Sequence, residues 1–231
     1  MIADTTNYTT PAKGHIGLGM EGFIASWYAR QTFKDMEVFR ETARKLSSQI
    51  APNARVLEVA PGPGYLSIEL ARLTRCRMIA LDISHTFVRI ANENAEKAGV
   101  DVCFEQGDAA DLPYPTSVLD FIVCRAAFKN FTRPLAALNE MYRVLKPGGA
   151  ALIIDLRKDF SSQDVKKFVE GKGFVNALLI RLIFNTMLKK RAYTREAILD
   201  LAAQSDFRQG DLHLDSVGFE LWLRKPAVGA G

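Results

Sequence analysis

Metal-binding and disulfide-forming residues are scarce in this chain. Its 231 residues include three cysteines and three histidines, and no two cysteines have Cys-x-x-Cys spacing. We therefore expect neither a bound metal nor a disulfide framework, and the widely separated cysteines favour a reducing, cytoplasmic location. Cys103 and Cys124 lie in apolar runs, so we predict that both are small buried hydrophobic side chains.

Long apolar runs and a dominant charge sign are missing as well. The most apolar stretch, residues 174–188, carries Arg181 in its middle, so we expect no transmembrane segment. The N-terminus lacks a basic region followed by an apolar one, and we expect no signal peptide. The net charge is +4 without a dense Lys/Arg block, so we expect no DNA partner. The length suits one α/β domain with a full core.

What the chain does have is a strand, a glycine turn and a helix in succession. The apolar run Val56–Val59 predicts a buried strand, which breaks at Pro61-Gly62-Pro63-Gly64. Apolar residues then resume at helical spacing at Leu66 and Leu70. Glycines in such a turn allow a ligand to lie against the backbone, and the helix directs its first amides toward that ligand. Taken alone, the turn is equally compatible with a simple tight connection.

Two carboxylates stand at the ends of the first two predicted strands. Glu58 would face the crevice and position a bound cation or ammonium group. Asp82 ends the strand Arg77–Asp82, about 20 residues after the glycines, where a carboxylate commonly accepts hydrogen bonds from a ribose. These features leave two interpretations, a dinucleotide oxidoreductase and a methyltransferase that binds S-adenosylmethionine.

An ordered set of motifs distinguishes between them. In sequence order it comprises Glu58-x-x-x-Gly62-x-Gly64, Leu81-Asp-Ile-Ser84, Gln106-Gly-Asp-Ala109, Leu112-Pro-Tyr-Pro115, Leu119-Asp-Phe121 and Glu140-Met-Tyr-Arg-Val-Leu-Lys-Pro-Gly-Gly149. Over residues 52–157 the set resembles the class I S-adenosylmethionine-dependent methyltransferases, in particular the small-molecule group that includes the quinone-biosynthesis C-methyltransferases. The chain departs from that family at Ala60 and Pro61, which should stiffen the turn without abolishing it. Tyr142-x-x-x-Lys146 matches the pair of short-chain dehydrogenases, but Lys146 directly precedes Pro-Gly-Gly, which argues against that class.

The resemblance implies a Rossmann-like α/β fold with a seven-stranded, mostly parallel sheet, a reversed last strand and helices on both faces. We expect further strands at 101–106, 118–124 and 151–155, and helices at 84–98 and 135–145. Two alternating runs about Ser216-Val-Gly218 predict a final β-hairpin. Residues 1–50 would form an N-terminal helical lid. Residues 51–231 would form the methyltransferase domain, with a helical insertion at about 160–205.

The family's cofactor is S-adenosyl-L-methionine, and its product is S-adenosyl-L-homocysteine. By resemblance Asp108 would accept a hydrogen bond from the adenine amino group and the Ala109 amide would lie at the ring edge, although Asp108 also reads as a turn-forming residue. The predicted cofactor-binding residues are Glu58, Ala60, Gly62, Gly64, Asp82, Ile83, Asp108, Ala109 and Arg125.

The loop after the fourth strand carries the predicted catalytic residues. Lys129-Asn130-Phe131-Thr132 is similar to the Arg-Asn-Val-Thr/Asp segment of the quinone C-methyltransferases, whose arginine is implicated in catalysis. Lys129 would stabilise a phenolate, or act as a base if burial lowers its pKa, and Asn130 would hydrogen-bond the acceptor. A solvated loop charge is the alternative for Lys129. His15 is the one histidine that a lid would bring over the site, unless it is an ordinary surface residue.

The expected reaction is O- or C-methylation of a small aromatic or lipophilic acceptor. Tyr28, Phe128, Phe131 and Asp155 are the predicted substrate-binding residues, although the aromatic ones would serve equally well as plain core. The apolar stretch 174–188 would pack against the core and against a substrate, a partner chain or a membrane surface. Two other functions stay open: a cofactor-binding partner protein without turnover, and a methyltransferase that acts on RNA or protein. A homodimer is also compatible with the sequence.

Overall fold

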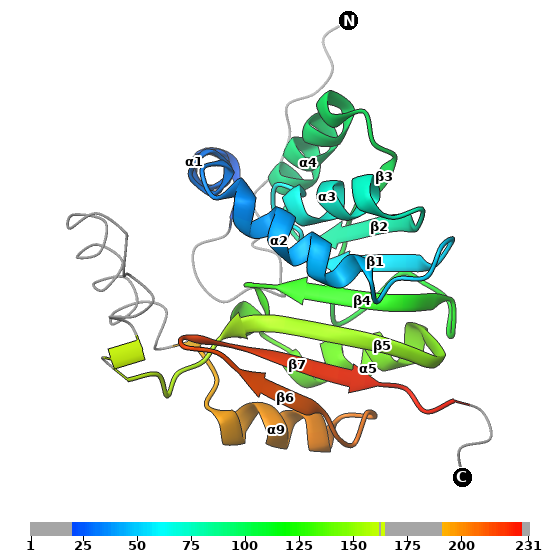
Figure 1. Ribbon diagram of the computed structural model, residues 1–231, viewed down its shortest axis with the longest axis vertical. Helices are drawn as coiled ribbons and strands as arrows, with labels where there is room; N and C mark the ends of the chain where they lie inside the picture. The colour runs from blue at the N-terminus through cyan, green and yellow to red at the C-terminus, as the bar shows by residue number, and fades with distance from the viewer. Residues whose placement is uncertain (1–19, 162, 165–190, 228–231) are drawn as a thin grey trace, which may run out of the picture.

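The computed structural model describes residues 20–161, 163–164 and 191–227, which are arranged about a seven-stranded sheet (Figure 1). Its strands occur in the order β3-β2-β1-β4-β5-β7-β6. The strands from β1 to β5 run parallel, whereas β7 runs antiparallel to β5 and to β6. The predicted α/β class and reversed strand are confirmed. The strands are β1 (Arg55–Val59), β2 (Arg77–Asp82), β3 (Val102–Gln106), β4 (Leu119–Arg125), β5 (Leu145–Leu156), β6 (Asp211–Leu214) and β7 (Gly218–Arg224).

Helices cover both faces of the sheet. One apolar cluster joins α2, α3 and α4 to one face, and a second cluster joins α5 and α9 to the other. The alternation of side chains along β1 shows the division, because Val56 belongs to the first cluster and Leu57 to the second. The helices are α1 (Gly22–Phe33), α2 (Met36–Ser47), α3 (Tyr65–Leu73), α4 (His85–Ala98), the short 3₁₀ helix η1 (Phe128–Asn130), α5 (Pro134–Val144) and α9 (Arg195–Gln204).

Local signals in the sequence set the helix ends. The Ser84 hydroxyl accepts a hydrogen bond from the Phe87 amide at 3.1 Å and caps α4, which ends at Gly99 with φ of +64°. Thr194 caps α9 in the same way through the Ala197 amide. Pro134 occupies the first turn of α5, where backbone N–H groups have no intrahelical acceptor, so the missing N–H of proline costs no hydrogen bond.

Two expectations were wrong. Strand β5 begins at Leu145 and not at Ala151, because Leu145 pairs with Leu119 while Ala150 pairs with Phe121, and the Lys146–Gly149 segment lies at this register shift. Cys103 is exposed because β3 is an edge strand and its alternate side chains point away from the core, whereas Cys124 is buried as expected. The predicted helix at 174–188 and the segment that contains His15 lie outside the described residues. Within the described ranges, no helix has the length and apolar character to cross a membrane.

The order of the strands reverses between β1 and β4. Such a switch point opens a crevice at the carboxyl ends of the strands, where ligands of open α/β sheets bind. The glycine turn follows β1 at this edge, and Arg125 ends β4 beside it. Helix α1 lies at the same edge, to which the arrowheads of β4 and β5 point (Figure 1). The fold thus brings Glu58, Asp82, Arg125 and Asp155, which stand at the carboxyl ends of their strands, to one end of the sheet.

Gly64 and Gly62 offer a matched test of packing at the turn. A Cβ on Gly64 would stand 2.7 Å from the Phe104 ring and 2.9 Å from the Ala91 Cβ. We expect Gly64→Ala to lower the free energy of unfolding by about 2–4 kcal/mol, from overpacking and positive-φ strain together. Gly62→Ala has the strain (φ of +55°) but open space, and should cost about 1 kcal/mol. Urea unfolding measures both, and equal losses would contradict the packing role of Gly64.

Candidate functional site

The glycine turn is fixed by the end of β2. The Gly62 amide donates to Asp82 Oδ2 at 2.9 Å, and the Ser84 amide donates to Asp82 Oδ1 at 2.8 Å. The Ala60 amide donates to the Leu81 carbonyl at 2.8 Å. Ala60 takes a φ of +56°, a region that favours glycine, so the turn forms with alanine at this position.

The outer side of the turn is open at Gly62. Apart from the neighbouring residues of the turn, no heavy atom of the described residues lies within 4 Å of the position that a Cβ on Gly62 would occupy. The neighbouring Asp82 side chain is buried, and desolvation raises its pKa, although the Ser84 and Gly62 amides oppose that rise. A carboxylate oxygen has two lone pairs, so Asp82 keeps acceptor capacity beside this open space. A ribose with two hydroxyl groups suits such an acceptor.

A segment from the start of α1 closes over the beginning of α4. The Glu21 carboxylate accepts hydrogen bonds from the His85 and Thr86 amides, both at 3.0 Å, and from the Thr86 hydroxyl. The Ser84 hydroxyl donates to the Met20 carbonyl. An anion is stabilised at a helix N-terminus. Glu21 thereby joins the N-terminal helices to the element next to Asp82, a role that its local sequence does not signal.

Glu58 and Arg125 lie on the α2–α4 face of the same edge. Glu58 is fully enclosed and accepts a hydrogen bond from the Ser67 hydroxyl of α3. Burial raises its pKa to about 7, against the opposing effects of Ser67 and Arg125. The Arg125 guanidinium stands 4.7 Å from the centre of the Phe39 ring, and burial lowers its pKa. The site therefore holds a carboxyl and a guanidinium that would serve an amino-acid group.

Tyr28 reaches this region from α1. Its ring packs edge-on against Phe87 at 5.8 Å and leaves 36% of the residue exposed. Partial burial raises the pKa of its phenol, while the charge of Arg125 opposes that rise. Tyr28 thus packs α1 against the first turn of α4, within electrostatic reach of Arg125 at the end of β4.

Asp108 follows β3 and is already engaged on both oxygens. Oδ1 accepts from the Ala110 amide at 2.9 Å, and Oδ2 pairs with the Arg133 guanidinium at 2.9 Å. The side chain is part-exposed, so lone pairs remain for a ligand amino group. Arg133, just before α5, is a residue that sequence reasoning missed. Ala109 lies half-buried beside Asp108. The Ile83 carbonyl accepts a hydrogen bond from the side-chain nitrogen Nε2 of Gln106 at 3.3 Å.

Lys129 is buried in an ion pair and is not a solvated loop charge. Its Nζ lies 2.8 Å from Asp155 Oδ1 and 2.6 Å from the Ala126 carbonyl oxygen. Its backbone amide donates to Asp155 Oδ2 at 2.9 Å. The 3₁₀ helix η1 is thereby attached to the end of β5. An ammonium held between two oxygens is a hydrogen-bond donor, which suits charge stabilisation better than proton removal.

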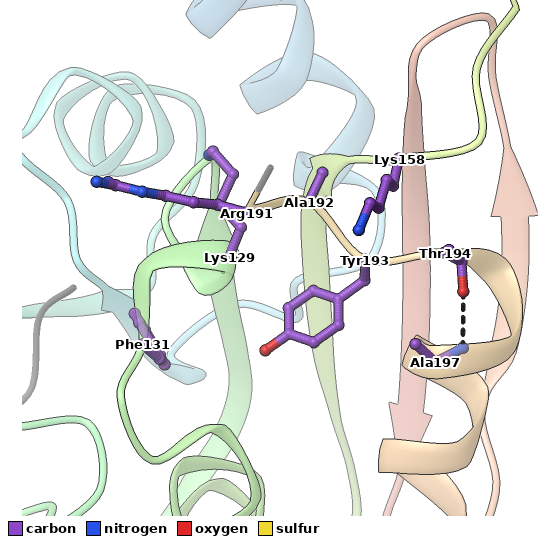
Figure 2. A pocket seen from close by; sticks show the side chains of 8 residues that line it. All are labelled: Lys129, Phe131, Lys158, Arg191, Ala192, Tyr193, Thr194 and Ala197. Carbon is purple, nitrogen blue, oxygen red and sulfur yellow. Dashed lines mark hydrogen bonds between the residues drawn. The ribbon is translucent and has the colours of Figure 1, made fainter. Parts of the chain in front are cut away.

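A cavity of about 390 Å³ lies beside this ion pair (Figure 2). Phe131 lines it, whereas Phe128 is fully enclosed in the core and supports Phe131 from behind, at 5.1 Å between ring centres. Asn130 is part-buried and accepts from Arg191 Nη1 at 3.4 Å. Besides two alanines, the lining residues are Lys129, Phe131, Lys158, Arg191, Tyr193 and Thr194. The last four were not predicted, because they follow the site in sequence and belong to no motif.

Glu58 predicts a pH dependence of stability. Its pKa rises from 4.5 to about 7 on folding, so the folded protein keeps a proton that the unfolded chain releases between those values. The free energy of unfolding should therefore fall as pH rises through this window, by about 3 kcal/mol in total. Chemical unfolding at several pH values should show this fall in wild type and not in Glu58→Gln. Glu96→Gln, at an exposed position on α4, is the control, and parallel profiles for wild type and Glu58→Gln would contradict the assignment.

Lys129 and Asp155 form a pair that a double-mutant cycle can measure. Lys129→Met leaves the Asp155 carboxylate buried without its cation, at a cost of about 3–5 kcal/mol. Adding Asp155→Asn removes the stranded charge, so the double variant should be more stable than Lys129→Met alone. The measurement is urea unfolding of all four proteins. Strictly additive losses would show that the pair is not coupled.

Part of the chain matches proteins of known family. Residues 56–149 match the family model described as "Methyltransferase domain". The chain is 36% identical over 102 residues to the demethylmenaquinone methyltransferase of Deinococcus radiodurans, a match that covers 44% of this chain and 42% of that protein. The chain therefore aligns with less than half the length of this curated relative.

Solved structures extend the similarity beyond residues 56–149. A Methanococcus maripaludis protein assigned as an S-adenosyl-L-methionine-dependent methyltransferase superimposes with a TM-score of 0.72 at 19% identity, over 99% of this chain and 100% of that one. The [4+2]-cyclase SpnF superimposes with a TM-score of 0.56 at 20% identity, over 81% of each chain. Residues 56–149 thus match a methyltransferase domain, and the described residues have the Rossmann-like fold of these solved structures.

Proposed function

We propose that this protein transfers a methyl group from S-adenosylmethionine to a small aromatic acceptor, by O- or C-methylation. The observation that carries the proposal is the contact between the Asp82 carboxylate and the Gly62 amide, at 2.9 Å, beside open space at the turn. It sets a buried acceptor for ribose hydroxyls next to a backbone that a ligand can approach. The methyltransferase domain match over the same residues supports this use of the site.

Three further groups would hold the rest of the cofactor. Glu58 and Arg125 would bind the ammonium and carboxylate of its amino-acid end, since the two side chains stand on one face near the ends of β1 and β4. Asp108, steadied by Arg133, would accept from the adenine amino group. When bound, S-adenosylmethionine supplies a methyl group on a sulfonium, which an electron-rich acceptor takes up by in-line displacement.

Lys129 and Asn130 would act on the acceptor. The Lys129 ammonium lies at the wall of the cavity, where it would stabilise a phenolate or enolate oxygen. Asn130 would donate its amide to the same acceptor while its oxygen holds Arg191. Positioning lowers the barrier of a displacement because it removes the entropic cost of bringing the two reactants together. Phe131 would provide an apolar wall, supported by Phe128.

The N-terminal helices would act as the cover of the site. The Tyr65 hydroxyl donates to the Ala29 carbonyl at 2.9 Å, which holds α1 at the first residue of the glycine-turn helix. Helix α1 also leaves Phe23 and Trp27 exposed by 77% and 51%. Apolar side chains at the mouth of the crevice would favour an aromatic or lipophilic acceptor over a polar one. Residues 1–50 as a lid, and His15 as its base, remain predictions, as do a cytoplasmic location and a homodimer.

A protein that binds the cofactor without turnover is the second candidate. It is favoured by the placement of Lys129, which is held as a donor, and by the lack of a base positioned over the cavity within the described residues. The fold is also compatible with other reactions, since the cyclase SpnF shares it. RNA or protein methylation has no comparable support in the structure.

Calorimetric titration of S-adenosylmethionine tests the cofactor site. We expect wild type to bind in the micromolar range, and Asp82→Asn to weaken binding by about tenfold or more because a charged acceptor is lost. Asp101→Asn is the matched control, since this aspartate lies exposed before β3. Absence of binding to wild type, or an equal effect in the control, would contradict the proposed site.

Transfer of a labelled methyl group to a panel of phenols, quinols and polar amines tests the reaction. Turnover on phenols or quinols that Lys129→Gln reduces, with cofactor affinity retained, would support the proposed enzyme. Tight cofactor binding without transfer to any acceptor would favour the non-catalytic protein. Transfer to amines alone would remove the aromatic acceptor from the proposal.

A further inference from the structure

The cavity beside Lys129 carries positive charge that the described residues do not neutralise. Among the described residues, three cationic side chains line it, Lys129, Lys158 and Arg191, and no carboxylate does. Lys129 is neutralised by Asp155 at 2.8 Å. Lys158 and Arg191 have no carboxylate partner among the described residues, and Arg191 donates a hydrogen bond to the neutral Asn130 oxygen at 3.4 Å.

The acidic residues near this wall are already engaged. Asp159 and Asp164 pair with Arg157, at 3.7 and 3.2 Å. Neither lines the cavity. The two unpaired cations therefore do not complete an internal ion-pair network of the described chain.

The backbone holds Lys158 in place at the cavity. Its amide donates to the Tyr193 carbonyl at 2.7 Å, and Arg157 forms a parallel bridge with Tyr193. Thr194, the next residue, caps helix α9, whose N-terminus adds partial positive charge at the same wall. A buried strand end and a helix start thus fix this cation, although its own side chain is exposed.

Aromatic surface lies between the two charges. In Figure 2 the Lys158 amine and the Arg191 guanidinium lie on opposite sides of the view, with the Tyr193 ring below and between them. Phe131 adds a second ring to the lining. A flat ring seated here would present its substituents toward a cation at either end. At the Arg191 end, the guanidinium contacts Asn130, which follows Lys129 in the chain. Lys129 pairs with Asp155 at the end of β5, on the edge of the sheet where the cofactor would bind.

We propose that this cavity binds a small aromatic anion, a carboxylate or a phosphate ester, with Lys158 and Arg191 supplying the positive charge. The inference rests on the proposed function, because the anion would be the methyl acceptor of the same site. It narrows the acceptor from aromatic compounds in general to those with an acidic group on the ring. A neutral lipophilic compound would leave both cations without a partner.

Paired ligands of equal shape test the proposal. Benzoate and benzamide differ in charge and little in size, so their affinities for wild type report the contribution of the cations. In low-salt buffer, titration followed by ligand-observed NMR should show benzoate binding about tenfold tighter than benzamide. Phenyl phosphate is the third probe, and whichever anion binds more tightly identifies the acidic group.

Charge-removing variants assign the preference to this cavity. Lys158→Gln and Arg191→Gln should each reduce the preference for benzoate about fivefold, and the double variant should lose it. Lys158→Arg keeps the charge and should keep the preference. Arg195→Gln removes an exposed charge that is near Arg191 in the sequence but does not line the cavity, and should change nothing.

Two results would overturn the inference. One is equal binding of benzoate and benzamide to wild type, and the other is an unchanged preference in the double variant. S-adenosylmethionine titrations of the same proteins distinguish a failure of the anionic-acceptor inference from a failure of the proposed function. If the cofactor binds normally but the preference is absent, only the anionic acceptor is wrong. If the preference is present but the cofactor does not bind, the proposed function fails and the anion site stands.

Discussion

The site depends on the two backbone amides that Asp82 accepts. One carboxylate joins the glycine turn after β1 to the start of α4, through Gly62 at 2.9 Å and Ser84 at 2.8 Å. Because the next two amides of α4 bind Glu21, the N-terminal helices attach at the same place. Desolvation of Asp82 is unfavourable, and these hydrogen bonds compensate for it. Asp82 therefore joins the turn to the α4 N-terminus, and Glu21 attaches the N-terminal helices to the same helix start.

Much of the fold could be predicted because its signals are local. The apolar run of β1, the Ser84 cap and Gly99 each act within a few residues, and the structure has the corresponding strand, helix start and helix end. The start of β5 could not be read in this way. Pro147-Gly148-Gly149 has the composition of a turn, but pairing with β4 extends the strand back to Leu145 across a register shift. A neighbouring strand decided that boundary, and no local pattern reports it.

The residues of the candidate site likewise divide into those that local sequence signals and those that it does not. Glu58 and Asp82 were found from their positions at strand ends, since parallel strands bring their carboxyl ends together. Glu21 and Arg133 act on partners that lie 64 and 25 residues away, and nothing in their own surroundings signals it. For Lys129 the sequence allowed a solvated charge or a functional one. Its buried partner Asp155, 26 residues further along, excludes the solvated charge.

The alternation of side chains along the strands places the two halves of the proposed reaction on opposite faces of the sheet. Arg125 points to the α2 side, where it meets Phe39, and Glu58 points the same way toward Ser67 of α3. Ile154 packs on the α2 side, so the next residue, Asp155, points to the α9 side. Lys129, which pairs with Asp155, and the cavity that Lys129 lines therefore lie on the α9 side as well. An in-line displacement needs its acceptor and its leaving group on opposite sides of the carbon that moves. A cofactor held from one face and an acceptor held from the other would meet that need at the sheet edge, without any large movement of the strands.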